Sequence, residues 1–71
     1  MKLHYYPETD SLYIDLNLRT SVDSREVADG VVVDLDDEGL IVGIDIDRAS
    51  SRLDLAAVET EALPVVPSGA T

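Results

Sequence analysis

The side chains with the clearest potential for chemistry in this 71-residue sequence are the acidic ones near its centre. Five residues there fit the calcium loop of an EF-hand at positions 1, 3, 5, 6 and 12, in the order Asp34, Asp36, Glu38, Gly39 and Asp45. Carboxylate oxygens are the ligands that Ca²⁺ prefers in proteins. One hypothesis for this acidic turn is therefore a site for a metal ion or a small ligand.

The residues on both sides of the turn argue against that hypothesis. An EF-hand loop joins two helices, whereas here Val-Val-Val precedes the acids and Leu-Ile-Val-Gly-Ile follows them with the alternation of strands. We therefore predict a hairpin with residues 36–39 at its tip, Gly39 in the left-handed conformation, and no metal site. Asp34, Asp36 and Glu38 are the candidate ligands for the alternative.

Groups suited to catalysis are scarce. The chain has one His and no Cys, and it lacks a Gly-x-Ser-x-Gly elbow, a phosphate-binding loop and a His-x-x-x-His pair. Asp45 and Asp47 share one face of a predicted strand, and His4 lies in another. A small hydrolase built from these groups would need a cleft between two copies. We predict that the protein is not an enzyme and that it needs no cofactor.

Alternation of apolar and polar residues predicts four strands. They cover residues 2–6, 12–18, 26–35 and 40–47, and Gly30 marks a bulge or a close backbone approach within the third. Pro7 ends the first strand because it has no backbone donor to continue a ladder. The polar residues 19–25 read as a loop.

A short helix is expected over residues 52–62. Ser51 and Asp54 have the spacing of a capping box, Leu55 and Val58 fall on one helical face, and Pro64 stops the helix. The predicted fold is α+β: a four-stranded antiparallel meander with one C-terminal α-helix against one face. We expect one domain over residues 1–63 and a disordered tail over residues 64–71.

The second face of this sheet suggests an interface. Tyr13, Val32 and Ile41 each point away from the main core by the period of two. A domain of this size buries only about 60% of the surface of its unfolded chain, so covering the second face adds stability. We therefore expect a homodimer or partner surface at Tyr13, Val32 and Ile41.

Charge limits the classes of partner. Fifteen acidic residues face five basic ones, for a net charge of −10, which repels nucleic acid and anionic membranes. A basic protein is the partner that this charge favours; alternatively, the acids serve only to solvate the surface. Met1 begins no signal peptide, and no apolar run is long enough to span a membrane, so we expect a cytoplasmic protein.

Four stretches carry a resemblance to a known family. They are residues 6–14 (Tyr-Pro-Glu-Thr-Asp-Ser-Leu-Tyr-Ile), 30–36 (Gly-Val-Val-Val-Asp-Leu-Asp), 39–46 (Gly-Leu-Ile-Val-Gly-Ile-Asp-Ile) and 49–50 (Ala-Ser). With them the chain resembles the YuzE-like family of small bacterial and archaeal proteins, a domain of unknown function. Asp45 stands where that family more often has Glu.

The resemblance implies a protein-binding role and no chemistry. Some relatives are encoded beside small toxin-like proteins, which implies an antitoxin-like role that the acidic surface would suit. No catalytic or ligand residue carries over. The motif residues can be explained structurally, by turns, a bulge and bonds across strands; they are Tyr6, Asp10, Tyr13, Asp34, Asp36, Gly39 and Gly43.

Overall fold

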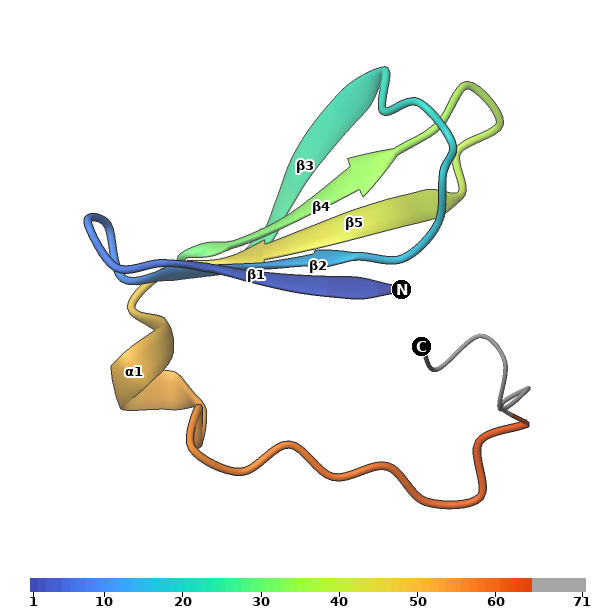
Figure 1. Cartoon of the computed structure of the whole chain (residues 1–71). Helices are drawn as coiled ribbons and strands as arrows, with labels where there is room; N and C mark the ends of the chain where they lie inside the picture. Colours follow the sequence, from blue (N-terminus) through green and yellow to red (C-terminus); the bar gives the residue numbers. More distant parts are fainter. Residues whose placement is uncertain (65–71) are drawn as a thin grey trace.

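A single antiparallel sheet makes up most of the protein (Figure 1). The computed structural model describes residues 1–64. Its elements are β1 (Lys2–Tyr6), β2 (Ser11–Asp15), β3 (Asp23–Ala28), β4 (Val31–Leu35), β5 (Ile41–Ile46) and the short helix α1 (Ala49–Arg52). The strands lie in the order β1-β2-β5-β4-β3. In the described part, no helix is long and apolar enough to cross a membrane.

The sheet has five strands, so the prediction of four was wrong. The predicted strand 26–35 is divided by a two-residue turn at Asp29 and Gly30, and β3 already begins at Asp23, inside the predicted loop 19–25. Gly30 has φ 74°, in the left-handed region that glycine occupies at little cost. Asp-Gly between two apolar runs is a strong hairpin signal. The prediction missed it because the three valines after Gly30 were assigned to the same strand as the residues before Asp29.

The strand order also differs from the predicted meander. β2 pairs with β5, while residues 16–22 cross the ends of β5 and β4 to reach the far edge of the sheet. The connection is anchored at both ends, because the Leu16 N–H donates to the Val42 carbonyl at 3.0 Å and the Val22 N–H to the Leu35 carbonyl at 2.8 Å. Periodicity identifies a strand but does not name its neighbour, and this is why the meander was wrong.

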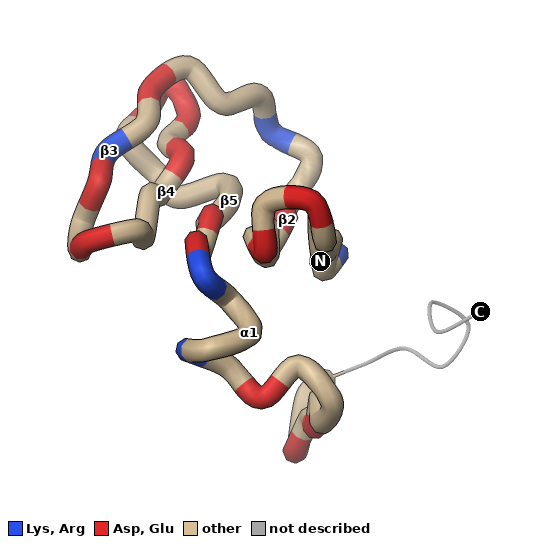
Figure 2. The backbone as a smooth tube through the Cα atoms, turned by 90° about the vertical axis from the view of Figure 1, so that its left-hand side faces the viewer, with Lys and Arg blue, Asp and Glu red and all other residues tan. Residues whose placement is uncertain are grey.

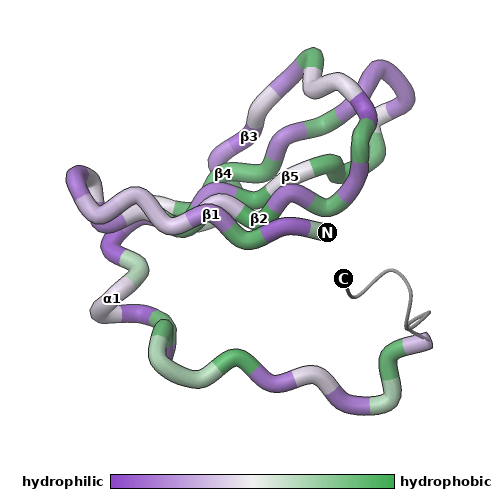
Figure 3. Tube along the Cα trace, in the orientation of Figure 1, coloured by the Kyte–Doolittle hydropathy of each residue, from purple (hydrophilic) through white to green (hydrophobic). Residues whose placement is uncertain are grey.

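Pairing gives the sheet two distinct faces, and hydropathy accordingly alternates along the strands (Figure 3). We call one the apolar face: Leu3, Tyr5, Leu12, Ile14, Val31, Val33, Ile44 and Ile46. We call the other the polar face: Lys2, His4, Tyr6, Tyr13, Asp15, Ser24, Glu26, Val32, Asp34, Gly43 and Asp45. The buried apolar core is small: Val33, Leu35, Val42 and Ala49.

A bulge corrects the expected position of Ile41. Leu35 pairs with Ile41 while Asp34 pairs with Gly43, so Val42 is an extra residue in β5. Paired residues point to the same side of a sheet, and Ile41 therefore lies on the side of Leu35 rather than with Val32. The three predicted interface residues do not form one surface, although Tyr13 and Val32 do share the polar face.

The helix is shorter and earlier than predicted. α1 ends at Arg52, and Leu53 is already extended, with φ −129° and ψ 150°. In the predicted helix, Leu55 and Val58 are 36% and 69% exposed, so no packed surface supports a helix there. The predicted disordered tail, residues 64–71, lies outside the described residues except for Pro64.

Asp10 fastens the start of α1 to the turn between β1 and β2. Its Oδ2 accepts the Ser50 hydroxyl at 2.7 Å, and its Oδ1 accepts the Ser50 N–H at 3.1 Å and the Tyr5 hydroxyl at 2.7 Å. Its carbonyl accepts the Ala49 N–H at 2.8 Å. Bonds from Ser50, and then from Tyr5, lower the pKa of Asp10. This carboxylate, and not the predicted Ser51 cap, sets where the helix begins.

Asp10→Asn is expected to lower the melting temperature by several degrees at pH 7, since an amide accepts fewer of these bonds. The stabilisation from a lowered pKa is complete above the unfolded value of 3.8 and is lost as the pH falls through the folded value. The difference in melting temperature between the variant and the parent should therefore shrink as the pH falls below 3.8. Glu8→Gln, an exposed change in the same turn, is the control. An undiminished difference at pH 2 would refute the ionic contribution.

Candidate functional site on the polar face

Four carboxylates, one from each of four strands, lie on the polar face and are diagonal to one another in two rows. In one row Tyr13, Asp45, Val32 and Glu26 are paired across the sheet; in the next row the order is Asp15, Gly43, Asp34 and Ser24. Period-two alternation places each acid on this face, and antiparallel register brings the rows together. Figure 2 shows how widely Asp and Glu are spread over the molecule and how few Lys and Arg lie among them.

Tyr13 reaches across Gly43 to Asp34. The Tyr13 hydroxyl donates to Asp34 Oδ2 at 2.7 Å, and the Ser24 hydroxyl donates to Asp34 Oδ1 at 2.6 Å. A Cβ at Gly43 would collide with the Tyr13 hydroxyl, so glycine is needed here for space. The bond to Asp34, with burial and the nearby carboxylates, raises the pKa of Tyr13 to about 12. Tyr13 is therefore a neutral donor and a poor base.

Asp45 is the least satisfied carboxylate of the face. Its Oδ1 is buried and has no hydrogen-bond partner among the described residues. Burial first, and then the charges of Asp47 and Asp34, raise the pKa of Asp45. Ionised Asp45 therefore destabilises the isolated protein. A cation or a hydrogen-bond donor from another molecule would offset this loss of free energy.

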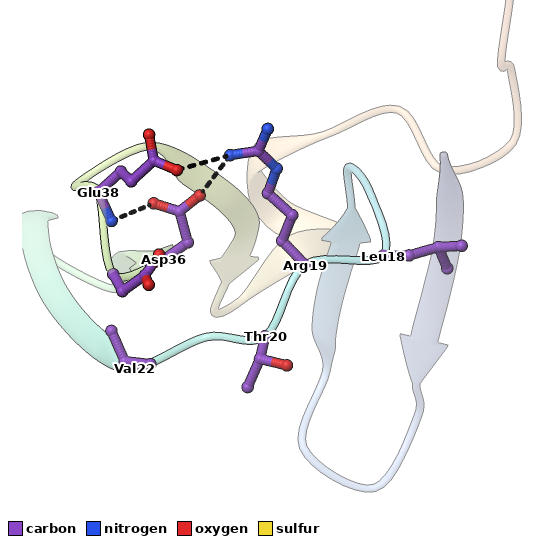
Figure 4. Close-up of a pocket in the computed structure, with 7 residues that line it drawn as sticks. Leu18, Arg19, Thr20, Val22, Asp36 and Glu38 are labelled. Atoms are coloured by element: carbon purple, nitrogen blue, oxygen red, sulfur yellow. Dashed lines mark hydrogen bonds and ion pairs between the residues drawn. The ribbon is translucent and has the colours of Figure 1, made fainter.

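The candidate calcium ligands do not converge. Asp34 is bound by Tyr13 and Ser24, whereas Asp36 sits beyond the end of β4 in a shallow hollow of about 400 Å³ (Figure 4). Glu38 is 71% exposed at its side chain, 3.9 Å from Arg19. Among residues 1–64, no group of three or more His, Asp or Glu side chains is placed to hold a metal ion.

Asp36 instead closes the β4–β5 turn. Its side chain is 3% exposed; Oδ2 accepts Arg19 Nη1 at 2.9 Å, and Oδ1 accepts the N–H groups of Glu38 and Leu40, each at 2.9 Å. The Arg19 bond and then the Leu40 bond lower the pKa of Asp36. The acidic turn that suggested a metal loop is thus held by its own backbone and one arginine.

The groups considered for hydrolysis are also dispersed. His4 is exposed, stacks on Tyr6 with ring centroids 6.0 Å apart, and pairs across the sheet with Tyr13. Asp47 lies beyond β5 and accepts the Ser11 hydroxyl at 3.3 Å. Sequence reasoning missed the Asp10–Ser50 link, although Ala49 and Ser50 belong to the recognised pattern. Asp10 has a lowered pKa and is a weak base, so it does not activate Ser50.

Gly43→Ala should destabilise the protein by about 1–3 kcal/mol, the usual cost of forcing extra volume into a packed position. Since Tyr13 is the obstacle, the same substitution in a Tyr13→Leu background should cost distinctly less. Urea unfolding of the four proteins of this double-mutant cycle measures the difference. Equal costs in both backgrounds would show that Tyr13 does not require the glycine.

Asp45→Asn should raise the melting temperature by a few degrees at pH 7. The pKa of Asp45 is raised above 3.8 in the folded state. Ionisation of Asp45 therefore destabilises the folded protein as the pH rises through its folded-state pKa. The gain should vanish below pH 3.5, where the parent carboxyl is protonated. Asp37→Asn in the exposed turn is the control. A lower melting temperature at pH 7 would contradict the assignment.

Comparison with known proteins identifies a family without a known activity. A family model described as "Protein of unknown function (DUF2283)" matches residues 2–50. Comparisons with curated proteins and with solved structures found no match. The matched residues include all five strands and the Asp10–Ser50 link to α1. The chain therefore belongs to the DUF2283 family of proteins of unknown function.

Proposed function

We propose that this protein is a non-enzymatic interaction module that binds a basic protein through the polar face of its sheet. The observation that carries the proposal is the set of four carboxylates on that face, Asp15, Asp45, Asp34 and Glu26, each on a different strand and diagonal to the next. Long side chains in diagonal positions are within reach of one another, so these like charges repel. Their presence together is better explained by a cationic partner than by the needs of the fold.

The few cations of the chain are mostly engaged elsewhere. The chain has five basic residues; the four arginines form ion pairs away from this face, with Asp36, Asp23 and Asp29. Only Lys2, on the edge strand, lies on the polar face by register. The four acids of the face thus have one basic neighbour by register, Lys2, which is paired with Asp15.

Aromatic rings on the same face favour arginine in the partner. Tyr13, Tyr6 and His4 lie on β1 and β2 beside the acids. A guanidinium group pairs with a carboxylate through two N–H donors and also stacks on aromatic rings, which an ammonium does less well. An arginine-rich surface is therefore the chemistry that suits this face.

The more specific likeness to YuzE-like proteins supports one kind of partner. Because some of those relatives are encoded beside small toxin-like proteins, we propose an antitoxin-like role toward a small basic toxin in the cytoplasm. The weak bases described above, Asp10 and Tyr13, support the non-enzymatic part of the proposal.

A labelled nona-arginine peptide should bind the protein with an affinity that falls as salt increases. The double variant Asp15→Asn/Asp45→Asn should weaken binding at least tenfold. Asp37→Asn/Asp54→Asn removes the same charge outside the polar face and should change affinity less than twofold. Fluorescence anisotropy measures all three. Equal losses in both double variants would show that net charge alone attracts the peptide, and would refute the proposed site.

A further inference from the structure

The apolar face is exposed at its β1 edge and only partly buried across its centre. Leu3 and Tyr5 are 48% and 44% exposed, and no large side chain of the described part is fully buried. The solvent-accessible surface of the chain is 5509 Å². A compact monomer of 7.7 kDa exposes about 4,300 Å². The chain thus exposes about 1,200 Å² more than its mass requires, in part through the extended segment after α1.

The chain supplies little to cover this face. α1 has four residues, and the segment that follows passes beneath the sheet without forming a second layer (Figure 1). A groove of about 700 Å³ separates the two. On the sheet side it is lined by Leu3, Tyr5, Leu12, Ile14 and Ile46, and on the other side by residues of the segment 53–59. A sheet must bury its apolar face against another layer, and here that layer is missing.

We infer that the missing layer is a second copy of this chain, whose apolar face packs on the first to form a two-sheet sandwich. A stable interface buries about 800 Å² on each partner, and the apolar face supplies the part of the excess surface that the extended segment after α1 does not. Two identical sheets with matched twist pack face to face at about 10 Å. The interface is isologous, as expected for a dimer with a twofold axis.

Two copies could meet through their apolar faces, their polar faces or their sheet edges, and the distribution of charge favours the apolar faces. β1, β2, β4 and β5 place no charged residue on the apolar face, and at the β3 edge Arg25 is 3.8 Å from Asp23 of its own chain. Face-to-face packing therefore turns the acids of the polar face outward in both chains, beyond the Debye length of about 8 Å, while Asp54 and Glu59 line the other side of the groove. Stacking the polar faces would oppose like charges, and pairing edges would leave the apolar face uncovered.

The inference is independent of the proposed function, because it concerns the opposite face. A sandwich of this kind presents two polar faces that point away from each other. One dimer would then bind two basic partners, or two sites on one partner, and gain affinity from the linkage.

Sedimentation equilibrium of the full chain at micromolar concentration should give twice the mass of one chain. Leu3→Asp adds a charge at a half-exposed position of the apolar face and should weaken the dimer at least tenfold. His4→Asp, the adjacent residue on the polar face, should leave the dimer intact. Loss of the dimer in both variants, or a monomeric parent, would overturn the inference.

A second measurement identifies the contact in the unaltered protein, should Leu3→Asp fail to fold. In a mixture of isotope-labelled and unlabelled chains, intermolecular NOEs should join the methyl groups of Leu12, Ile14, Ile44 and Ile46. Intermolecular NOEs at Val32 instead would place the interface on the polar face. Contacts found only within one chain, between Leu12 and the segment 53–59, would show that the chain covers its own sheet. Either result would refute the proposed dimer, and neither bears on peptide binding by the polar face.

Discussion

Pairing of β2 with β5 is the constraint on which the rest of the structure depends. It sets Leu12 beside Ile46 and Ile14 beside Ile44, so these apolar pairs lie on one side of the sheet. The same register sets Tyr13 and Asp15 on the other side, beside Asp45 and Gly43. A slip of one residue would exchange the two faces and expose the apolar set to water. This alignment places the β2 and β5 residues of both faces, and the β4–β5 and β3–β4 registers extend the faces across the sheet.

Stability and recognition draw on different carboxylates. Asp10 and Asp36 have lowered pKa values because each accepts several hydrogen bonds, and each fastens a turn to the element that follows. Asp45 has a raised pKa because burial and neighbouring charges disfavour its ionised form. Residues that weaken a fold in this way are typical of functional surfaces, where binding provides the interaction that the isolated chain lacks.

The pattern shared with the family describes a scaffold more than a site. Gly43 leaves room for Tyr13, Asp34 accepts the Tyr13 hydroxyl, and Ser50 donates to Asp10. In this chain these contacts join strands and turns and hold the sheet together.

Sequence alone determined which segments are extended and how their side chains alternate, because a period of two is a local property of the chain. It located most strand residues and the left-handed Gly39. It also placed Tyr13 and Val32 together correctly, and it interpreted the EF-hand spacing correctly as a hairpin.

Only the tertiary structure decided the order of the strands, the Asp29–Gly30 turn, the bulge that moves Ile41, and the short helix fastened by Asp10. Most of these features depend on contacts between residues distant in sequence. The Asp29–Gly30 turn has a local signal, which was missed because the valines after it continue the pattern of a strand. The Tyr13–Asp34 bond joins residues 21 positions apart and required β5 to lie between their strands. Alternation assigns a side chain to a face, but packing alone determines which other side chains it meets there.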